Sequence, residues 1–113
     1  MITALKQLHQ PGLIQAACLL RNKEVEASTF EASERNYQTI ARQAFSYIFH
    51  NASRVGANHN ESHLEIGHMR LSGFLMKQGW ILVCLSPKHS NIQLVREVVK
   101  CSQQELASAV QSA

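Results

Sequence analysis

The most constraining feature of this chain is an almost entirely apolar run at residues 13–20. It is too short for an independent helix, and Pro11–Gly12 ends any helix that comes before it. A short apolar run of this kind is typical of a central strand that is buried on both faces of a sheet. A second run, residues 80–85, predicts another core strand. The chain is therefore expected to fold around a sheet with these two strands inside it.

Helical periodicity marks three further stretches. Residues 2–10 carry apolar side chains at steps of three and predict a short first helix. Residues 34–50, with Ser33 as a plausible N-cap, give the strongest helix signal. Its predicted core face consists of Tyr37, Ile40, Ala41, Ala44, Phe45 and Ile48. A long C-terminal amphipathic helix is expected after Ser90–Gln93, which has the spacing of a capping box.

The remaining segments predict turns, strands and one loop. Residues 21–24 predict a hairpin turn in which Asn22 takes a positive φ, and residues 25–29 predict the returning edge strand. Residues 51–62 have no periodicity and predict a loop. Turn-like pairs at Ser72–Gly73 and Gln78–Gly79 divide the segment after this loop into strands at 63–70, 74–77 and 80–85, an antiparallel meander. The predicted order is α-β-β-α-β-β-β-α, an α+β fold in a single domain, residues 1–113.

Composition excludes several classes of function. Eleven Lys and Arg against eight acidic residues give a net charge of +3, with no basic stripe for a nucleic acid. All acidic residues are Glu, so chemistry that requires Asp is excluded. No apolar run is long enough to cross a bilayer, and no signal peptide is indicated. The sequence predicts a cytoplasmic protein without a nucleic-acid or membrane partner.

No catalytic constellation is found among the cysteines and other nucleophiles. Cys18 and Cys84 lie in the two apolar runs and are expected to be buried, whereas Cys101 is expected to be the most reactive. Neither a CxxC pair, nor a Gly-x-Ser-x-Gly motif, nor a phosphate-binding loop is present. We therefore expect a protein that is not an enzyme and holds no cofactor. Trp80 is expected in the core, with an aromatic ligand platform as the alternative.

Histidines suggest a metal site as a further alternative. His50, His59, His63 and His68 lie within one stretch, and His59 and His63 are four residues apart. That spacing converges only on a helix, and the Asn and Ser residues around them disfavour a helix. Solvated histidines on a loop and a strand are the favoured interpretation, so no metal is expected.

Two surfaces are candidates for contact with partners. The first is one stripe on the predicted second helix at steps of three and four: Arg35, Gln38, Arg42, Ser46 and Phe49. Phe49 lies off the apolar face, and an aromatic residue beside Arg is typical of interface centres. The alternatives are an isolated exposed Phe, or a stripe that helix pairing covers. The second candidate is the strand at 63–70, whose Leu64, Ile66 and His68 are expected to form a homodimer interface.

The whole pattern resembles the roadblock/LC7 superfamily. Pro11–Gly12, the strand at 13–20, the turn at Arg21-Asn22-Lys23 and the strand at 25–28 are similar to the opening of that family. The strand at 79–86 followed by Asn91-Ile92-Gln93-Leu94-Val95-Arg96 is similar to its close. Two features depart from the family: Asn22-Lys23 stands where the turn usually reads Asp-Gly, and the Asn/His-rich loop is long.

This resemblance implies one five-stranded antiparallel sheet, with the second helix on one face and the terminal helices on the other. It implies a homodimer formed by the second helices and the following edge strand. Bacterial members of the family work beside small Ras-like GTPases without binding nucleotide themselves. A non-enzymatic interaction module that binds or regulates such a GTPase is therefore the favoured hypothesis. A small-ligand sensor of profilin-like, PAS or GAF type is the alternative, and a histidine-based metalloenzyme is a third.

Overall fold

The computed structural model describes residues 1–56 and 60–111. Its helices and strands occur in this order: α1 (Ile2–Lys6), β1 (Ala16–Arg21), β2 (Glu24–Ser28), the 3-10 turn η1 (Ala32–Glu34), α2 (Arg35–Arg54), β3 (Glu61–Ile66), β4 (Met69–Leu75), the 3-10 turn η2 (Lys77–Gly79), β5 (Ile81–Pro87), α3 (Ile92–Cys101) and α4 (Gln103–Gln111). No helix in these two ranges is long and apolar enough to cross a membrane.

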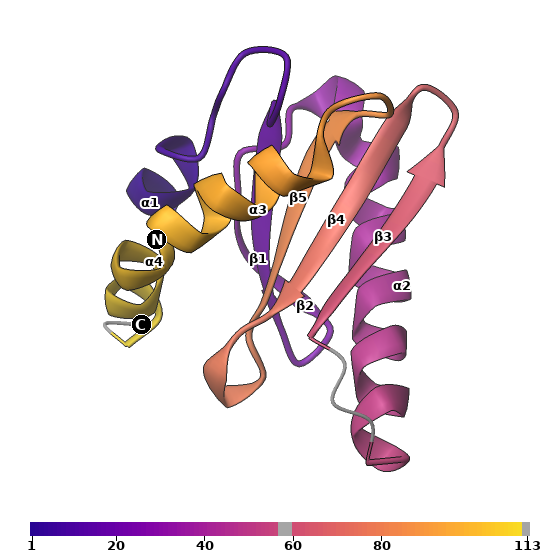
Figure 1. Cartoon of the computed structure of the whole chain (residues 1–113). Coiled ribbons are helices and arrows are strands. Elements are labelled where there is room, and N and C mark those ends of the chain that lie inside the picture. Colours follow the sequence, from indigo (N-terminus) through magenta and orange to yellow (C-terminus); the bar gives the residue numbers. More distant parts are fainter. Residues whose placement is uncertain (57–59, 112–113) are drawn as a thin grey trace.

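One antiparallel sheet of five strands forms the middle layer of the molecule. Its strand order is β2-β1-β5-β4-β3, so the two apolar runs lie inside the sheet and β2 and β3 form its edges. Figure 1 shows α2 alone behind the sheet and α1, α3 and α4 in front of it. The predicted α+β architecture and its arrangement of helices are confirmed.

The two faces of the sheet carry separate hydrophobic cores because successive residues of a strand point to opposite faces. In β1, Ala17 and Leu19 join the core beneath α1, α3 and α4. Cys18 and Leu20 join the core beneath α2. All four are buried, which explains why the run has no polar alternation. Burial raises the pKa of the Cys18 thiol to about 12, so this thiol stays protonated.

The β1–β2 turn agrees with its prediction, whereas the start of β1 does not. Asn22 and Lys23 both have positive φ, 53° and 67°, as a two-residue hairpin requires. The strand was expected from residue 13 but begins at Ala16. A backbone bridge between Gln10 and Ile14 folds the preceding residues into a turn, which sequence periodicity does not reveal.

The expected boundaries in the meander were wrong. The hairpin lies at Gly67–His68 rather than at Ser72–Gly73, and β4 runs through both of the latter residues. Gly67 supplies the positive φ of the turn, 60°. Gly73 instead lies in the strand, and its lack of a side chain leaves room for the Phe45 ring. A Cβ at this position would lie 2.6 Å from Cε1 of Phe45. A glycine that makes room for a ring was thus mistaken for a turn.

Helix ends also differ from the expectation. A reciprocal capping box between Glu31 and Glu34 precedes α2, so Ser33 is not its N-cap, and the helix continues to Arg54. Asn91 caps α3 by accepting a hydrogen bond from the Gln93 N–H, at 2.8 Å. The expected single C-terminal helix is broken at Ser102 into α3 and α4, and Figure 1 shows the chain changing direction between them.

Trp80 precedes β5 and is completely buried, which confirms its expected place in the core. The Arg21 guanidinium lies over its ring, 4.3 Å from the centroid. This cation–π contact ties the end of β1 to the start of β5.

Candidate partner interface

The edge strand β3 offers a row of backbone groups to a further strand. Within the described sheet β3 pairs only with β4, which confirms that this strand is an edge. The opposite edge, β2, exposes the charged side chains of Glu24 and Glu26, whereas on β3 only Glu65 is exposed and Glu61 is half-buried and paired with Arg96. Charges on an edge discourage pairing, whereas apolar side chains beside an unpaired edge favour it. Of the two edges, β3 is the better suited to meet another chain.

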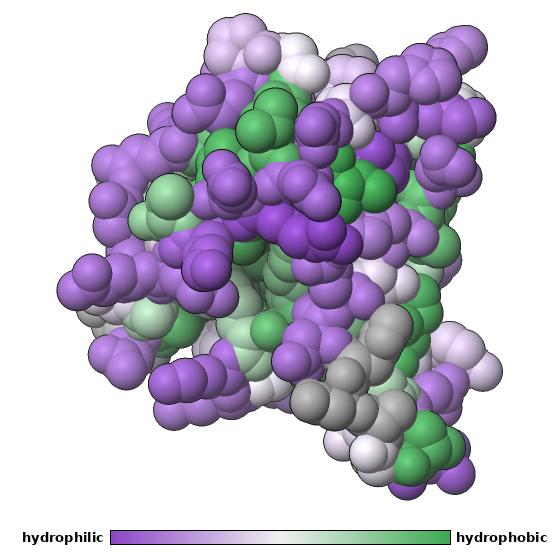
Figure 2. Space-filling view, in the orientation of Figure 1, coloured by the Kyte–Doolittle hydropathy of each residue, from purple (hydrophilic) through white to green (hydrophobic). Residues whose placement is uncertain are grey.

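Apolar side chains continue from β3 onto the adjacent flank of α2. We call the following half-buried residues, which pack at the border of the core beneath α2, the α2–β3 margin: Leu64, Ile66, Tyr37, Ile40 and Ile48. On the outer side of the same helix the Tyr47 side chain is 70% exposed. Figure 2 shows hydrophobic residues gathered along the side of the molecule where β3 and α2 lie. The margin therefore presents apolar surface next to unpaired backbone.

His68 does not belong to this margin, contrary to the expectation. Leu64 and Ile66 lie on the α2 side of β3, but the strand ends at Ile66 and His68 is exposed in the turn. The prediction assumes that strand side chains continue to alternate between the two faces past Gly67. The backbone reverses direction at this residue, so the alternation ends there. Of the three predicted dimer residues, only Leu64 and Ile66 therefore lie on the same face of β3.

Four of the predicted partner-binding residues do form one flank of α2. Arg35, Gln38, Arg42 and Ser46 follow one another along the side of the helix that borders β2 and the β1–β2 turn. Gln38 accepts a hydrogen bond from the Ser28 hydroxyl, and Arg42 Nη1 donates a 3.4 Å bond to the Lys23 carbonyl. The flank is therefore partly anchored to the sheet rather than turned fully outward.

Phe49 was wrongly placed on that surface. Its side chain is only 4% exposed and its ring stacks on Phe45, with the ring centroids 6.2 Å apart. Ala41, Phe45 and Phe49 follow at steps of four and form the centre of the buried face of α2. The expected helix already included Phe49, and its spacing of four residues from Phe45 was the signal in the sequence that places it on the buried face.

A polar cluster links β3 to α3 on the other face of the sheet. The Glu61 carboxylate accepts hydrogen bonds from His63 Nε2, at 2.6 Å, and from Arg96 Nε, at 2.7 Å. His63 Nδ1 lies 2.8 Å from the Ser72 hydroxyl. Partial burial raises the pKa of Glu61, but these hydrogen bonds and the charge of Arg96 outweigh burial and lower the pKa. The cluster holds the edge strand against the helix.

The histidines considered as metal ligands in the sequence do not form a cluster among the described residues. His63 is engaged by Glu61 and Ser72, while His50 and His68 are exposed on α2 and in the β3–β4 turn. His59 lies outside the described residues. No three His, Cys or Glu side chains in residues 1–56 and 60–111 are grouped so that they could hold a metal ion.

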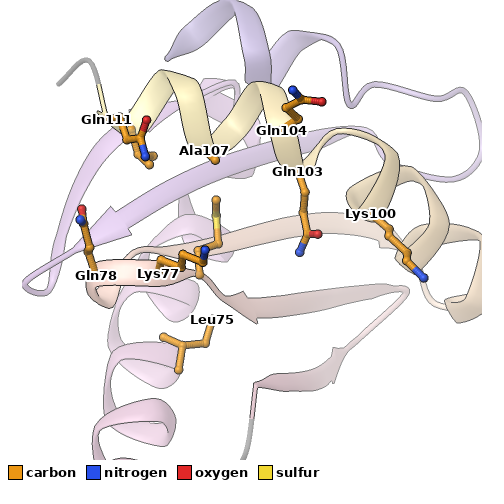
Figure 3. Close-up of a pocket in the computed structure, with 10 residues that line it drawn as sticks. Leu75, Lys77, Gln78, Lys100, Gln103, Gln104, Ala107 and Gln111 are labelled. Carbon is orange, nitrogen blue, oxygen red and sulfur yellow. The ribbon is translucent and has the colours of Figure 1, made fainter.

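A surface hollow of about 540 Å³ lies between η2 and α4. In Figure 3, Gln103 points from the start of α4 toward the sheet, and Lys100 lies at one end of the hollow. Gln78 and Gln111 lie at its other end. Its polar lining consists of glutamine amides and the ammonium groups of Lys77 and Lys100, and no carboxylate, hydroxyl, thiol or imidazole lines it.

Comparison with solved structures identifies the fold. A roadblock/LC7 domain from Streptomyces avermitilis superposes with a TM-score of 0.79 at 13% identity, over 98% of each chain. The gliding protein MglB from Thermus thermophilus gives 0.73 at 16% identity, over 99% of this chain and 89% of that one. A structure described as MglB with a tetrameric arrangement gives 0.72 at 16% identity, over 98% and 88%.

The sequence matches no protein-family model, and no curated protein matches it. The structural likeness alone shows a fold of the roadblock/LC7 type that spans nearly the whole chain. The resemblance read from the two ends of the sequence is confirmed at the level of the fold.

Proposed function

We propose that this protein is a non-enzymatic, homodimeric interaction module that binds or regulates a small Ras-like GTPase. The observation that carries the proposal is a roadblock/LC7-type fold over 98% of the chain, combined with an apolar margin beside an unpaired edge strand. The resemblance to roadblock proteins supplies the class of partner. The cytoplasmic location predicted from the sequence is part of the proposal.

Homodimer formation would use the α2–β3 margin. A two-fold axis beside β3 would bring two copies of the same margin together, as a self-complementary interface requires. Burial of half-exposed Ile and Tyr side chains contributes about 25 cal/mol for each Å² removed from water. One of the similar structures is described as a tetrameric arrangement of MglB, so self-association occurs on this fold.

The GTPase would contact the polar flank of α2. Arg35 is exposed at the start of this flank, and no carboxylate of the described residues lies within 4.0 Å of it. Arginines without an acidic partner bind the carboxylates and phosphates found near a nucleotide-binding site. In a dimer formed through the α2–β3 margin, each copy would present one such flank on the outer side of its own α2, facing away from the dimer interface.

The test measures binding of purified Ras-like GTPases from the host, loaded with GDP or with a GTP analogue. We expect Arg35→Glu to weaken binding at least tenfold, about 1.4 kcal/mol, while the dimer mass is unchanged. Arg54→Glu is the matched control, because Arg54 is also exposed and lies at the far end of the same helix.

Binding that is lost equally in both variants would show a general charge effect rather than a specific surface. If wild type binds none of the host's Ras-like GTPases in either nucleotide state, the proposed partner class is wrong. If sedimentation shows a monomer, the homodimer is wrong whatever the GTPase result.

A further inference from the structure

Two adjoining hollows lie between α2 and the β1–β2 turn, away from the α2–β3 margin. Their volumes are about 270 and 450 Å³. Lys23, Ser46 and His50 line both, so the two hollows form one continuous groove, which we call the turn groove. Arg42 lines only the smaller hollow, which we call the basic half. Phe49, Leu75, Met76 and Ile81 line only the larger hollow, which we call the apolar half, although Lys23 and His50 reach both.

Cationic and donor groups converge on the basic half. Lys23, Arg42 and His50 line it, and no carboxylate lines either half. Among the described residues none of the three forms an ion pair with a carboxylate. The one hydrogen bond of Arg42 goes to a neutral carbonyl and is long, 3.4 Å. Its guanidinium is therefore available for bidentate contact with an oxyanion.

Ser46 adds an unsatisfied hydroxyl at the junction of the two halves. Its Oγ is buried and has no hydrogen-bond partner among the described residues. A buried hydroxyl without a partner is costly, so such groups in a native protein call for a ligand or an equivalent acceptor. An anion seated between Lys23 and Arg42 would provide that acceptor after rotation of the Ser46 side chain.

The apolar half combines apolar side chains with the polar groups of Asn22, Ser53 and the shared Lys23, Ser46 and His50. Phe49, Leu75, Met76 and Ile81 contribute to it, and Phe49 and Ile81 are core residues whose positions are set by packing. A ligand that fits both halves carries a negative charge at one end and a compact apolar group at the other. Hollows that combine apolar walls with a few convergent polar groups are the usual form of small-molecule sites.

We propose that the turn groove binds a small phosphate monoester with an apolar or aromatic body. A phosphate group is favoured over a carboxylate because it presents three acceptor oxygens and nearly two negative charges, which match separate donors on Lys23, Arg42 and Ser46. The groove shares Arg42 and Ser46 with the polar flank of α2. A small ligand is nevertheless a different function from the proposed GTPase contact, and its test requires no protein partner. Binding of such a ligand would agree with the alternative hypothesis from the sequence, that the protein is a small-ligand sensor.

The test is calorimetric titration of the full chain with phenyl phosphate, inorganic phosphate and benzoate. We expect phenyl phosphate to bind about tenfold more tightly than inorganic phosphate, because only the ester fills the apolar half. We expect benzoate to bind more weakly than phenyl phosphate. Arg42→Gln should weaken phenyl phosphate at least tenfold, the loss typical of one charge-assisted hydrogen bond.

Two further variants keep the result interpretable. Lys23→Asn removes the charge at a turn position where Asn tolerates positive φ, so it tests the site without disturbing α2. Arg54→Gln removes the same charge from a residue outside the groove and should leave binding unchanged.

Absence of phenyl phosphate binding at concentrations up to about 10 mM would overturn the proposal. Equal weakening by Arg42→Gln and Arg54→Gln would also overturn it, because it would show that the effect is only net charge. If benzoate binds as tightly as phenyl phosphate, the phosphate assignment is wrong and the groove recognises carboxylates.

Discussion

Phe45 packs its ring directly on the backbone of β4 at Gly73. The ring is fully buried and belongs to the core beneath α2. A Cβ at Gly73 would meet the ring at 2.6 Å from Cε1 and 2.9 Å from Cγ, closer than real Cβ atoms approach. Because a ring in a packed core has little room to move, this one contact sets the distance between α2 and the sheet.

We expect Gly73→Ala to lower the free energy of unfolding by about 1–3 kcal/mol, because the added methyl overpacks the core. Urea denaturation followed by circular dichroism measures this loss. In a Phe45→Leu background, which removes the ring, the same substitution should cost clearly less. If the cost is the same in both backgrounds, the contact between Gly73 and the ring does not explain the glycine.

At the scale of elements, the edge strand β3 is held by polar groups on one face and by apolar groups on the other. Glu61 binds Arg96 of α3, while Leu64 packs against the core beneath α2. Surface ion pairs contribute little to stability, so the apolar face dominates the attachment. The polar cluster instead fixes the position of the strand relative to α3.

The Glu61 cluster predicts a pH dependence of stability. Its lowered pKa means that the native state favours the carboxylate, so the stabilisation is fully present above the unfolded value, about 4.3, and is lost as the pH falls through the lowered native value. We expect Glu61→Gln to lower the free energy of unfolding by less than about 1 kcal/mol at pH 7.

That difference between Glu61→Gln and wild type should shrink progressively as the pH falls below about 4.3, the ordinary pKa of Glu, in denaturation curves measured at each pH. Glu97→Gln is the matched control: Glu97 is exposed on α3, and its carboxylate forms no ion pair with the described residues. A difference that stays constant over this range would contradict the role given to the Glu61 carboxylate.

One side of the molecule, where β3 and α2 lie, has a more apolar surface than the β2 edge of the sheet. Helices cover both faces of the sheet and charges line the β2 edge, but the α2-facing side chains of β3 and the adjacent flank of α2 are apolar and half-exposed (Figure 2). Contiguous apolar patches on a soluble domain usually mark interaction sites. The proposed dimer would remove this surface from water.

Ile66→Lys places a charge within the proposed dimer interface, and two lysines would meet across the two-fold axis. We expect the dimer dissociation constant to rise at least about tenfold, measured by analytical ultracentrifugation, because the charge must be desolvated and repels its copy. Glu65→Lys introduces the same residue on the opposite face of β3 and should leave the dimer intact. An unchanged dimer in a folded Ile66→Lys protein would show that β3 is not the interface.

Local patterns in the sequence were sufficient for the element types and for the central strands. Hydrophobic periodicity is set by geometry within one element, and the Asn22–Lys23 turn follows from backbone preferences of two residues. The burial of Cys18, Cys84 and Trp80 and the edge positions of β2 and β3 were predicted correctly for the same reason. Likewise the resemblance to the roadblock fold came from the order of elements.

Tertiary packing decided what local patterns do not contain. Gly73 lies in a strand, and a ring from α2 fills the space that a side chain would take there. The Glu61 cluster joins residues from two elements 35 positions apart, and the turn groove joins a hairpin turn to the middle of a helix. Contacts between distant segments depend on how the elements are placed in space, and periodicity within one segment carries no information about that placement.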